Sequence, residues 1–412
     1  MSNEEWAQEH NAQGRRQREW RSTAIRLLRF RLPPRDRDEV HRGSTSLELM
    51  FDLATVVAVS TAAHGLAQEV ENGNFTLGTI KFLCTFFMAW LAWVNYTWFA
   101  SAYDNKSTAF RTLSMVIMFG SLALAAGIRG AFGDQPIWLV LVGFIIMRFG
   151  MIALWLGAAN GDRDMRPTAL RYAAGIGVLQ VYWNLLIAVV SPQASLYIPL
   201  FMLGAAGELL VPVLAEQRSR TSWHHGHIVD RYNSFNIIVL GECFASIVAI
   251  ISDSSPPDLQ HFWLAGLCSV IAFSMWRLYF DRNKQLLGRD LGAVLLWSYG
   301  HYVLFAAGAA TAAGFAIFLA VIGKHAEISV QSACLAVAIP IAVYLGSLWL
   351  VRDRPLVKGA KRWLLVAAGV LVLASSTFAN HPLELIAAVL VITVIARDRL
   401  HQAVPGKGDA HN

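Results

Sequence analysis

The sequence predicts an all-α integral membrane protein of about twelve transmembrane helices, with both termini in the cytoplasm. The 412-residue chain is 55% hydrophobic and only 15% charged, and its mean hydropathy is +0.45. Long apolar stretches follow one another along it, most of them near the ~20 residues that cross a ~30 Å hydrocarbon core. The charges between these stretches alternate from gap to gap, which gives the orientation.

The apolar stretches fill nearly all of the chain after residue 43, so no separate soluble domain is expected. The unbroken run at 290–323 also allows a re-entrant segment, and the last stretch is short for a full crossing. The predicted spans are 47–67, 78–102, 111–132, 136–158, 168–190, 195–214, 233–252, 259–281, 290–312, 327–350, 362–379 and 382–396.

Positive charge gathers on one side of the predicted membrane. Of the 34 Lys and Arg, 29 lie before the first stretch, in or at the borders of every second gap, or in the tail, whereas the opposite gaps and their borders hold only Lys81, Arg129 and Lys324. Short loops rich in Lys and Arg stay cytoplasmic, so both termini are predicted to lie there. The net charge of +6 therefore indicates anionic lipid headgroups rather than nucleic acid, for which no base-reading motif is present.

The segment 1–43 is strongly basic and has no hydrophobic signal core, so we expect a cytoplasmic segment rather than a cleaved secretory peptide. Between Arg15 and Arg31 its arginines interleave with Trp, Ile, Leu and Phe, and Pro33 then ends any helix. Such a helix can lie in the headgroup layer, where each cation contributes ~1 kcal/mol. A basic tail that only fixes orientation is an equal alternative.

The two halves of the membrane region share a signature. Trp93 and Tyr96 precede Asp104 after the second stretch, and Trp276 and Tyr279 precede an Asp-Arg-Asn-Lys run after the eighth. Because each half has six spans, an even number, the halves would form a parallel repeat with a site at their interface. The predicted division is 1–43 for the basic segment, 44–214 for the first repeat, 215–232 for a cytoplasmic linker, 233–397 for the second repeat and 398–412 for a cytoplasmic tail.

The sequence favours neither an enzyme nor a metal or cofactor protein. No Ser-His-Asp arrangement, HExxH, GxGxxG or phosphate-binding loop appears in a suitable context. Histidines 224, 225 and 227 could hold a soft metal, but such loop histidines more often bind nothing specific. The cysteines lie in apolar stretches without CxxC spacing and are expected to be buried small side chains: Cys84, Cys243, Cys268 and Cys334.

Ionisable residues inside the apolar stretches carry the remaining chemical information, because a charge at the bilayer centre costs at least ~2.5–3.5 kcal/mol. Glu48 and Asp52 lie four residues apart, hence on one face of the first helix. Two carboxylates this close make a candidate proton or cation acceptor. The alternative is a cap on the helix N-terminus or a partner for Arg42, which suits Glu48 better than the deeper Asp52.

Three further residues are predicted near mid-membrane. Glu242 lies well inside the seventh stretch and is the central candidate for a proton or cation acceptor. His301 reaches a similar depth in the ninth stretch and is its expected relay or hydrogen-bond partner. Arg148 lies about halfway through the fourth stretch, and because it keeps its charge it needs an acidic partner, water or an anionic substrate.

Glu208 in the sixth stretch precedes Pro212, whose nitrogen cannot donate to the Glu208 carbonyl group. A broken helix with a carboxylate at the break is one way in which carriers expose a cation site. A tolerated kink in a helix packed through small residues is the alternative.

The run Leu47-Glu-Leu-Met-Phe-Asp-Leu53 resembles the first span of the bacterial low temperature requirement protein A family, which has a Glu-Leu-Phe-Phe-Asp-Leu pattern. The likeness continues from Trp93 to Asp104, in Ile237-Ile-Val-Leu-Gly-Glu242 and at His301. Met50 departs from the pattern, where the family has an aromatic residue. The resemblance covers nearly the whole membrane region and implies a bacterial inner-membrane protein, but no reaction or substrate.

This resemblance places Glu48, Asp52, Glu242 and His301 on motif positions. We expect a carrier of a small solute or ion, with proton coupling at Glu242 and a cytoplasmic gate at Glu48 and Asp52. One alternative is a cation channel in which Asp52 lines the pore of a homo-oligomer, since Phe51-Asp52 and the span count faintly resemble certain potassium channels. The same residues also suit a membrane-embedded enzyme for lipid substrates, or a structural protein for cold growth whose buried charges only pair.

Overall fold

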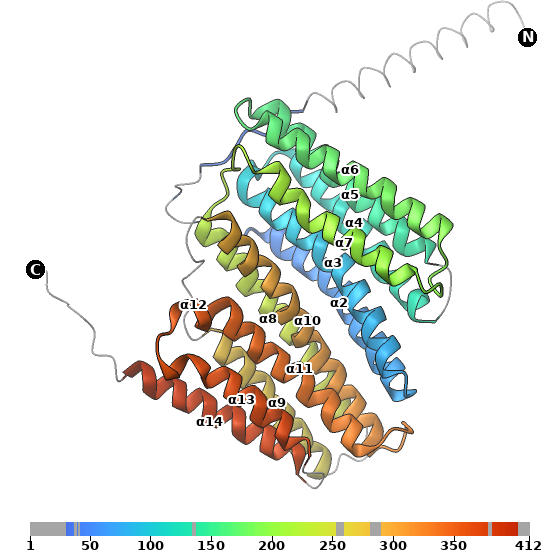
Figure 1. Cartoon of the computed structure of the whole chain (residues 1–412), viewed down its shortest axis with the longest axis vertical. Coiled ribbons are helices and arrows are strands. Elements are labelled where there is room, and N and C mark those ends of the chain that lie inside the picture. Colours follow the sequence, from blue (N-terminus) through green and yellow to red (C-terminus); the bar gives the residue numbers. More distant parts are fainter. Residues whose placement is uncertain are drawn as a thin grey trace, which may run out of the picture. The chain divides into compact units, whose positions relative to one another are not determined.

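The apolar stretches form long α-helices in the computed structural model of the chain (Figure 1). The structure describes residues 30–36, 39, 42–133, 137–252, 259–280, 290–377 and 381–402. The first helices are α2 (Ser46–Glu71), α3 (Phe75–Tyr103), α4 (Thr108–Phe132), α5 (Trp138–Gly161), α6 (Arg166–Val189) and α7 (Tyr197–Ala215). They are followed by α8 (His225–Ser252), α9 (Leu259–Tyr279), α10 (Leu291–Ile322), α11 (Val330–Leu348), the π-helix η1 (Trp349–Asp353), α12 (Arg354–Leu356), the 3-10 helix η2 (Ala360–Trp363), α13 (Leu364–Ser375) and α14 (Pro382–Gln402).

Ten helical segments in the described part of the chain are long and apolar enough to cross a membrane. They are α2 to α10 and the continuous segment Val330–Leu356, which begins with α11. The prediction of an all-helical, multi-pass membrane protein is therefore confirmed. The two remaining predicted spans coincide with α13 and α14, but α13 has only 12 residues, or about 18 Å of helix. Twelve full crossings thus stay a prediction.

Side-chain caps set the starts of several of these helices. The hydroxyl of Thr45 accepts a hydrogen bond from the first turn of α2, and the side chains of Asp290 and Ser329 do the same for α10 and α11. Each cap satisfies a backbone N–H group that has no partner within the helix. Local residues therefore determine where these helices begin as well as which stretches are helical.

Three helices differ from their predicted extents. Helix α8 begins at His225, before the predicted start at 233, because the charged side chains of its first turns have partners, among them Asp230, which accepts from the backbone and hydroxyl of Ser44. Helix α10 runs unbroken to Ile322, so the described residues contain no re-entrant break there. Helix α7 continues through Pro212, so of the two alternatives weighed for this proline the tolerated kink fits and the broken helix does not. Proline removes only one helical hydrogen bond near the end of α7, and the next turn re-forms at Glu216.

The chain divides into two compact units whose boundaries cut α3, α4 and α5. The first unit holds the described residues within 1–42, 94–120 and 141–224, and in it α6 packs beside α7. The second unit holds those within 43–93, 121–140 and 225–412. In the second unit α10 packs against α2, α8 and α11, while α9 packs against α8 and α14 (Figure 1). The predicted repeat and its boundaries stay predictions.

A short segment at the start of the described chain is anchored on α5 in the first unit. The N–H group of Leu32 donates to the carbonyl oxygen of Gly157 at 3.0 Å, and the Leu32 side chain is fully buried. A Cβ atom at Gly161 would overlap the backbone of Leu32, and one at Gly157 would overlap the ring of Phe30. The missing side chains of the two glycines therefore leave the space on α5 that Phe30 and the Leu32 backbone occupy. The basic residues up to 29, predicted as a surface helix or tail, lie outside the described residues.

Candidate functional site

Helices α2 and α8 lie in contact within the second unit, and polar contacts join them at three levels. Residue numbers increase together along the two helices from one level to the next, so the helices run parallel. We call this set the α2–α8 column. It consists of the pairs Glu48–His227, Asp52–Arg231 and Ser60–Glu242.

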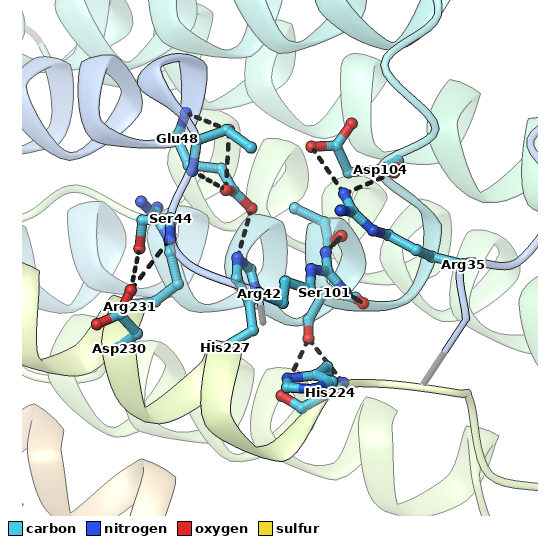
Figure 2. Close-up of polar contacts among 12 residues, drawn as sticks. Arg35, Arg42, Ser44, Glu48, Ser101, Asp104, His224, His227, Asp230 and Arg231 are labelled. Atoms are coloured by element: carbon cyan, nitrogen blue, oxygen red, sulfur yellow. Dashed lines mark hydrogen bonds and ion pairs between the residues drawn. The ribbon is translucent and has the colours of Figure 1, made fainter. Parts of the chain in front are cut away.

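Glu48 both caps α2 and contacts α8. Its Oε2 accepts hydrogen bonds from the backbone N–H (2.8 Å) and the hydroxyl (2.9 Å) of Thr45, and together they form a capping box. Its Oε1 lies 3.0 Å from Nε2 of His227, and both side chains are fully buried. Figure 2 shows the His227 ring pointing from α8 toward this carboxylate. The capping interpretation of Glu48 is confirmed, and its second oxygen links the two helices.

Asp52 forms the second level of the column and is bound on both oxygens. Arg231 donates from Nη1 to Oδ2 at 2.8 Å and from Nη2 to Oδ1 at 2.7 Å, a two-bond fork with fully buried partners. The indole N–H of Trp93 on α3 donates to Oδ1 at 2.6 Å. The Trp93 ring also stacks on Phe235 with 4.2 Å between centroids. Asp52 is therefore held by three strong donors, not left facing Glu48 alone.

Glu242 lies deepest along the column, about 26 Å of helix from the start of α8. It is half-buried, and the hydroxyl of Ser60 hydrogen-bonds its carboxyl group. Among its contacts with other described residues there is no cationic side chain. Glu242 thus differs from the other two acidic residues of the column, which contact a histidine and an arginine.

His301 belongs to a separate polar cluster of the second unit. Its Nδ1 lies 2.7 Å from the carbonyl oxygen of Trp297, one turn earlier in α10, and its Nε2 lies 3.2 Å from the hydroxyl of Tyr279 on α9. The rings of Tyr232 and Phe305 pack around it. Both ring nitrogens therefore have partners other than Glu242. The helical geometry of α10 turns this ring back onto its own backbone, so the expected hydrogen bond to Glu242 is not formed.

Arg148 on α5 and Glu208 on α7 form an ion pair in the first unit, through Nη2 and Oε1. The indole N–H of Trp183 on α6 donates to the same Glu208 oxygen at 2.9 Å. The Arg148 guanidinium lies over the ring of Phe144, 4.8 Å from its centroid. The two charged residues are only 2% and 3% exposed. The acidic partner predicted for Arg148 is therefore Glu208.

The first unit also carries a polar cluster at the end of α3 (Figure 2). Arg42 donates to the carbonyl oxygens of Ala100, at 2.7 Å, and of Ser101. These are among the last carbonyl groups of α3, and that of Ala100 also accepts from the backbone N–H group of Asp104 at 3.1 Å, so Arg42 acts as an additional, cationic cap. In the same cluster a hydrogen bond from Arg35 lowers the pKa of Glu39.

No group of three or more His, Cys, Asp or Glu that could hold a metal ion occurs in the described ranges. Of the three histidines that were weighed as metal ligands, His227 contacts Glu48, and the backbone N–H of His224 donates to the Ser101 hydroxyl at 3.0 Å. The four cysteines are free thiols, and three of them are buried.

Over residues 43–397 the chain matches the bacterial low temperature requirement A protein family, LtrA. The chain belongs to this family. The match runs from two residues before the α2 cap into α14 and confirms the resemblance seen in the first span. No curated protein and no solved structure matches the chain. Membership of the low temperature requirement A family therefore supports a multi-pass membrane protein and leaves its activity open.

Sequence reasoning about this LtrA family chain missed His227, Arg231 and the polar role of Trp93. His227 and Arg231 fall in the predicted linker, and Trp93 entered only as part of the repeated signature and of the family resemblance. A signal was nevertheless present: Glu48 and Asp52 are four residues apart, and so are His227 and Arg231. Two parallel helices with matching four-residue spacing can bring both pairs into register.

Proposed function

We propose that this protein carries a small solute or ion across the bacterial cytoplasmic membrane and couples that movement to protons at Glu242. The observation that supports this proposal is the setting of the Glu242 carboxyl group. It lies far along an apolar helix, is half-buried, and contacts the uncharged hydroxyl of Ser60. Ionisable groups in such a setting commonly mark proton and ion pathways.

Two other buried carboxylates, those of Asp52 and Asp353, are less suited to proton exchange on their own. Asp52 is forked by Arg231, and Asp353 at the end of η1 is forked in the same way by Arg397, at 2.7 and 2.8 Å. Protonating either carboxylate would leave a buried guanidinium without its counter-charge, which costs several kcal/mol. A proton can bind Glu242 without uncovering such a charge.

The region between Asp52 and Glu242 favours a carrier over an open pore. Arg231 and Glu242 are separated by about 16 Å of helix. Between them lie the stacked rings of Trp93 and Phe235. The ring of Phe305 packs edge-on against both, with centroid distances of 5.1 Å to Phe235 and 5.8 Å to Trp93. Packed aromatic rings next to an ion pair suit a cytoplasmic gate, because a carrier must keep one side closed while the other opens.

Proton-driven flux in proteoliposomes tests the proposal. The purified protein is reconstituted, and pH and potassium gradients are imposed separately on wild type and on Glu242→Gln. We expect flux that follows the proton gradient in wild type and is lost in Glu242→Gln. Glu384→Gln is the matched control, because this carboxyl group lies in the first turn of α14 and is not part of the column. Full activity of Glu242→Gln would overturn the assignment.

Two alternatives are separated by the same preparation. Single-channel currents that survive Glu242→Gln would favour a cation channel, whereas saturable slow flux favours a carrier. A structural role is favoured by the paired charges Asp52–Arg231, Arg148–Glu208 and Asp353–Arg397, since such pairs can simply tie helices together. Absence of all flux in correctly folded protein would support that structural role.

The topology belongs to the same proposal. The parallel course of α2 and α8 supports an even number of crossings between them, and with it a parallel repeat. The excess of Lys and Arg in alternate gaps supports a cytoplasmic N-terminus. The basic N-terminal segment is then positioned to contact anionic headgroups. Single cysteines introduced at residues 3 and 410 should react with a membrane-impermeant maleimide only in inside-out vesicles. Labelling in right-side-out vesicles would contradict the orientation.

A further inference from the structure

Arg148 uses only one of its three side-chain nitrogens in the described structure. Nη2 contacts Glu208, whereas Nε and Nη1 are buried and have no hydrogen-bond partner among the described residues. The residue is 2% exposed and lies about 15 Å of helix from the start of α5 and about 20 Å from its end. Buried guanidinium donors almost always have acceptors, so two unused nitrogens at this depth call for a ligand.

The described contacts of Arg148 are the carboxylate of Glu208 and the ring of Phe144, so they include no second hydrogen-bond acceptor. Phe144 covers one face of the guanidinium, and the Trp183 indole N–H is already directed to Glu208. The described contacts of Arg148 therefore leave its Nε and Nη1 without an acceptor.

We propose that Arg148 is the binding site for a small monovalent anion, chloride or a short carboxylate, which binds when Glu208 takes up a proton. The inference rests on the proposed carrier function and names its substrate class. In the empty state Glu208 neutralises Arg148. When a proton from water neutralises Glu208, the anion supplies the negative charge, so the site gains one proton and one anion and its net charge stays zero.

In this proposal the proton binds to Glu208. The described contacts of the pair come from Phe144 and Trp183, neither of which ionises. On the facing helix α6 the titratable groups are Tyr182, whose hydroxyl donates to the Leu200 carbonyl at 2.6 Å, Tyr172, bonded to Glu216, and the arginines of the first turns. Arg148 and Glu208 are the only charged residues of α5 and α7. Proton uptake on anion binding is thus assigned to the Glu208 carboxylate.

The test is anion-dependent thermal stability of the purified protein in detergent, followed by intrinsic tryptophan fluorescence. Chloride and acetate are each compared with gluconate at constant ionic strength from pH 5 to pH 8. A ligand that binds only the folded state raises the melting temperature. For wild type we expect stabilisation by the small anions that grows as the pH falls. Stabilisation by chloride alone, or by both anions, supports the site and identifies a halide or a general monoanion as its ligand.

Two variants decide the role of the pair. Glu208→Gln mimics the protonated carboxyl group, so it should bind chloride at least about tenfold more tightly at pH 7 and lose the pH dependence. Arg148→Gln combined with Glu208→Gln keeps the net charge and approximate shape, so it should fold and show no anion effect. Equal stabilisation of the double variant would place the anion elsewhere. If neither anion stabilised folded wild type or Glu208→Gln, the proposed anion site would be overturned, with water as the partner of Arg148.

The binding measurement needs no membrane and no gradient. Absence of anion binding therefore overturns the anion site, while proton-driven flux that depends on Glu242 would still support the proposed carrier. Anion binding with flux unaffected by Glu242→Gln would instead overturn the assigned proton acceptor and leave the Arg148 site standing.

Discussion

Replacing Asp52 alone and replacing Arg231 alone should lower the free energy of unfolding by unequal amounts, although the two residues form one ion pair. Asp52→Asn leaves a fully buried guanidinium with a neutral partner, and removal of one member of such a pair costs about 3–5 kcal/mol. The guanidinium cannot lose its charge, so this loss should not depend on pH between 5 and 7. Trp93 can still donate to the amide oxygen that the Asp52→Asn variant retains, which limits other damage.

Arg231→Met instead leaves a carboxylate that can become neutral. Protonating an aspartate with the ordinary pKa of ~3.9 costs about 4 kcal/mol at pH 7 and about 1.5 kcal/mol at pH 5. Because the carboxylate can become neutral by binding a proton, these values are upper limits on the stability lost by leaving it unpaired. The folded variant gains a proton as the pH falls, so its loss of stability should shrink by up to about 1.4 kcal/mol per pH unit. The double variant Asp52→Asn/Arg231→Met should recover most of the stability, since no buried charge remains.

The assay is unfolding by dodecyl sulfate in maltoside micelles at pH 5 and pH 7, followed by circular dichroism, for wild type, both single variants and the double variant. At pH 7 we expect a coupling energy of several kcal/mol between the two substitutions. At pH 5 this coupling energy should be smaller, because Arg231→Met then lowers the free energy of unfolding by less while the effect of Asp52→Asn is unchanged. Single variants that both stay within about 1 kcal/mol of wild type would refute the reasoning, because water must then reach the pair.

Trp93→Phe should keep the stack on Phe235 but remove a donor to a charged group, so we expect a loss of about 1.5–3 kcal/mol in the same unfolding assay, and an unchanged value would mean that Arg231 alone holds Asp52. Gly161→Ala should release the segment 30–36 from α5, seen as faster tryptic cleavage after Arg31 and Arg35, whereas Gly346→Ala, where nothing lies within 4 Å, should cleave like wild type. Burial raises the pKa of Glu216, which follows α7 and accepts from Tyr172 and Thr221, so the folded state binds this proton more tightly than the unfolded state. Stability should therefore fall as the pH rises from the ordinary glutamate pKa through the raised one, and a pH titration of Glu216→Gln should lack that loss.

Hydropathy predicted the helices closely because each bilayer crossing imposes its own length and polarity. Local chemistry also predicted the Glu48 cap. The partners of buried charges were harder to predict, since Asp52 and Arg231 are 179 residues apart and no local pattern records their contact. The sequence left a broken helix and a tolerated kink open at Pro212, and α7 continues because one lost hydrogen bond near a helix end is a small cost beside the packing of the whole helix.

The histidine prediction failed for a different reason. His301 was matched with Glu242 by depth alone, yet the ring is captured by the Trp297 carbonyl group of its own helix and by Tyr279. Depth along two helices does not fix the direction of two side chains around them. Arg148 and Glu208 were both identified as buried ionisable residues, but only the packing of α5, α6 and α7 brings them to one point.

The Asp52–Arg231 fork has a consequence for how the protein is made. A ribosome that adds 5–20 residues per second produces Arg231 roughly 9–36 s after Asp52, because 179 residues separate them. Trp93 follows Asp52 by only 41 residues and emerges much sooner. During membrane insertion, α2 must therefore reside in the translocon or the lipid with an aspartate whose ionic partner has not yet been synthesised. Any condition that slows translation prolongs this unpaired intermediate and its exposure to degradation.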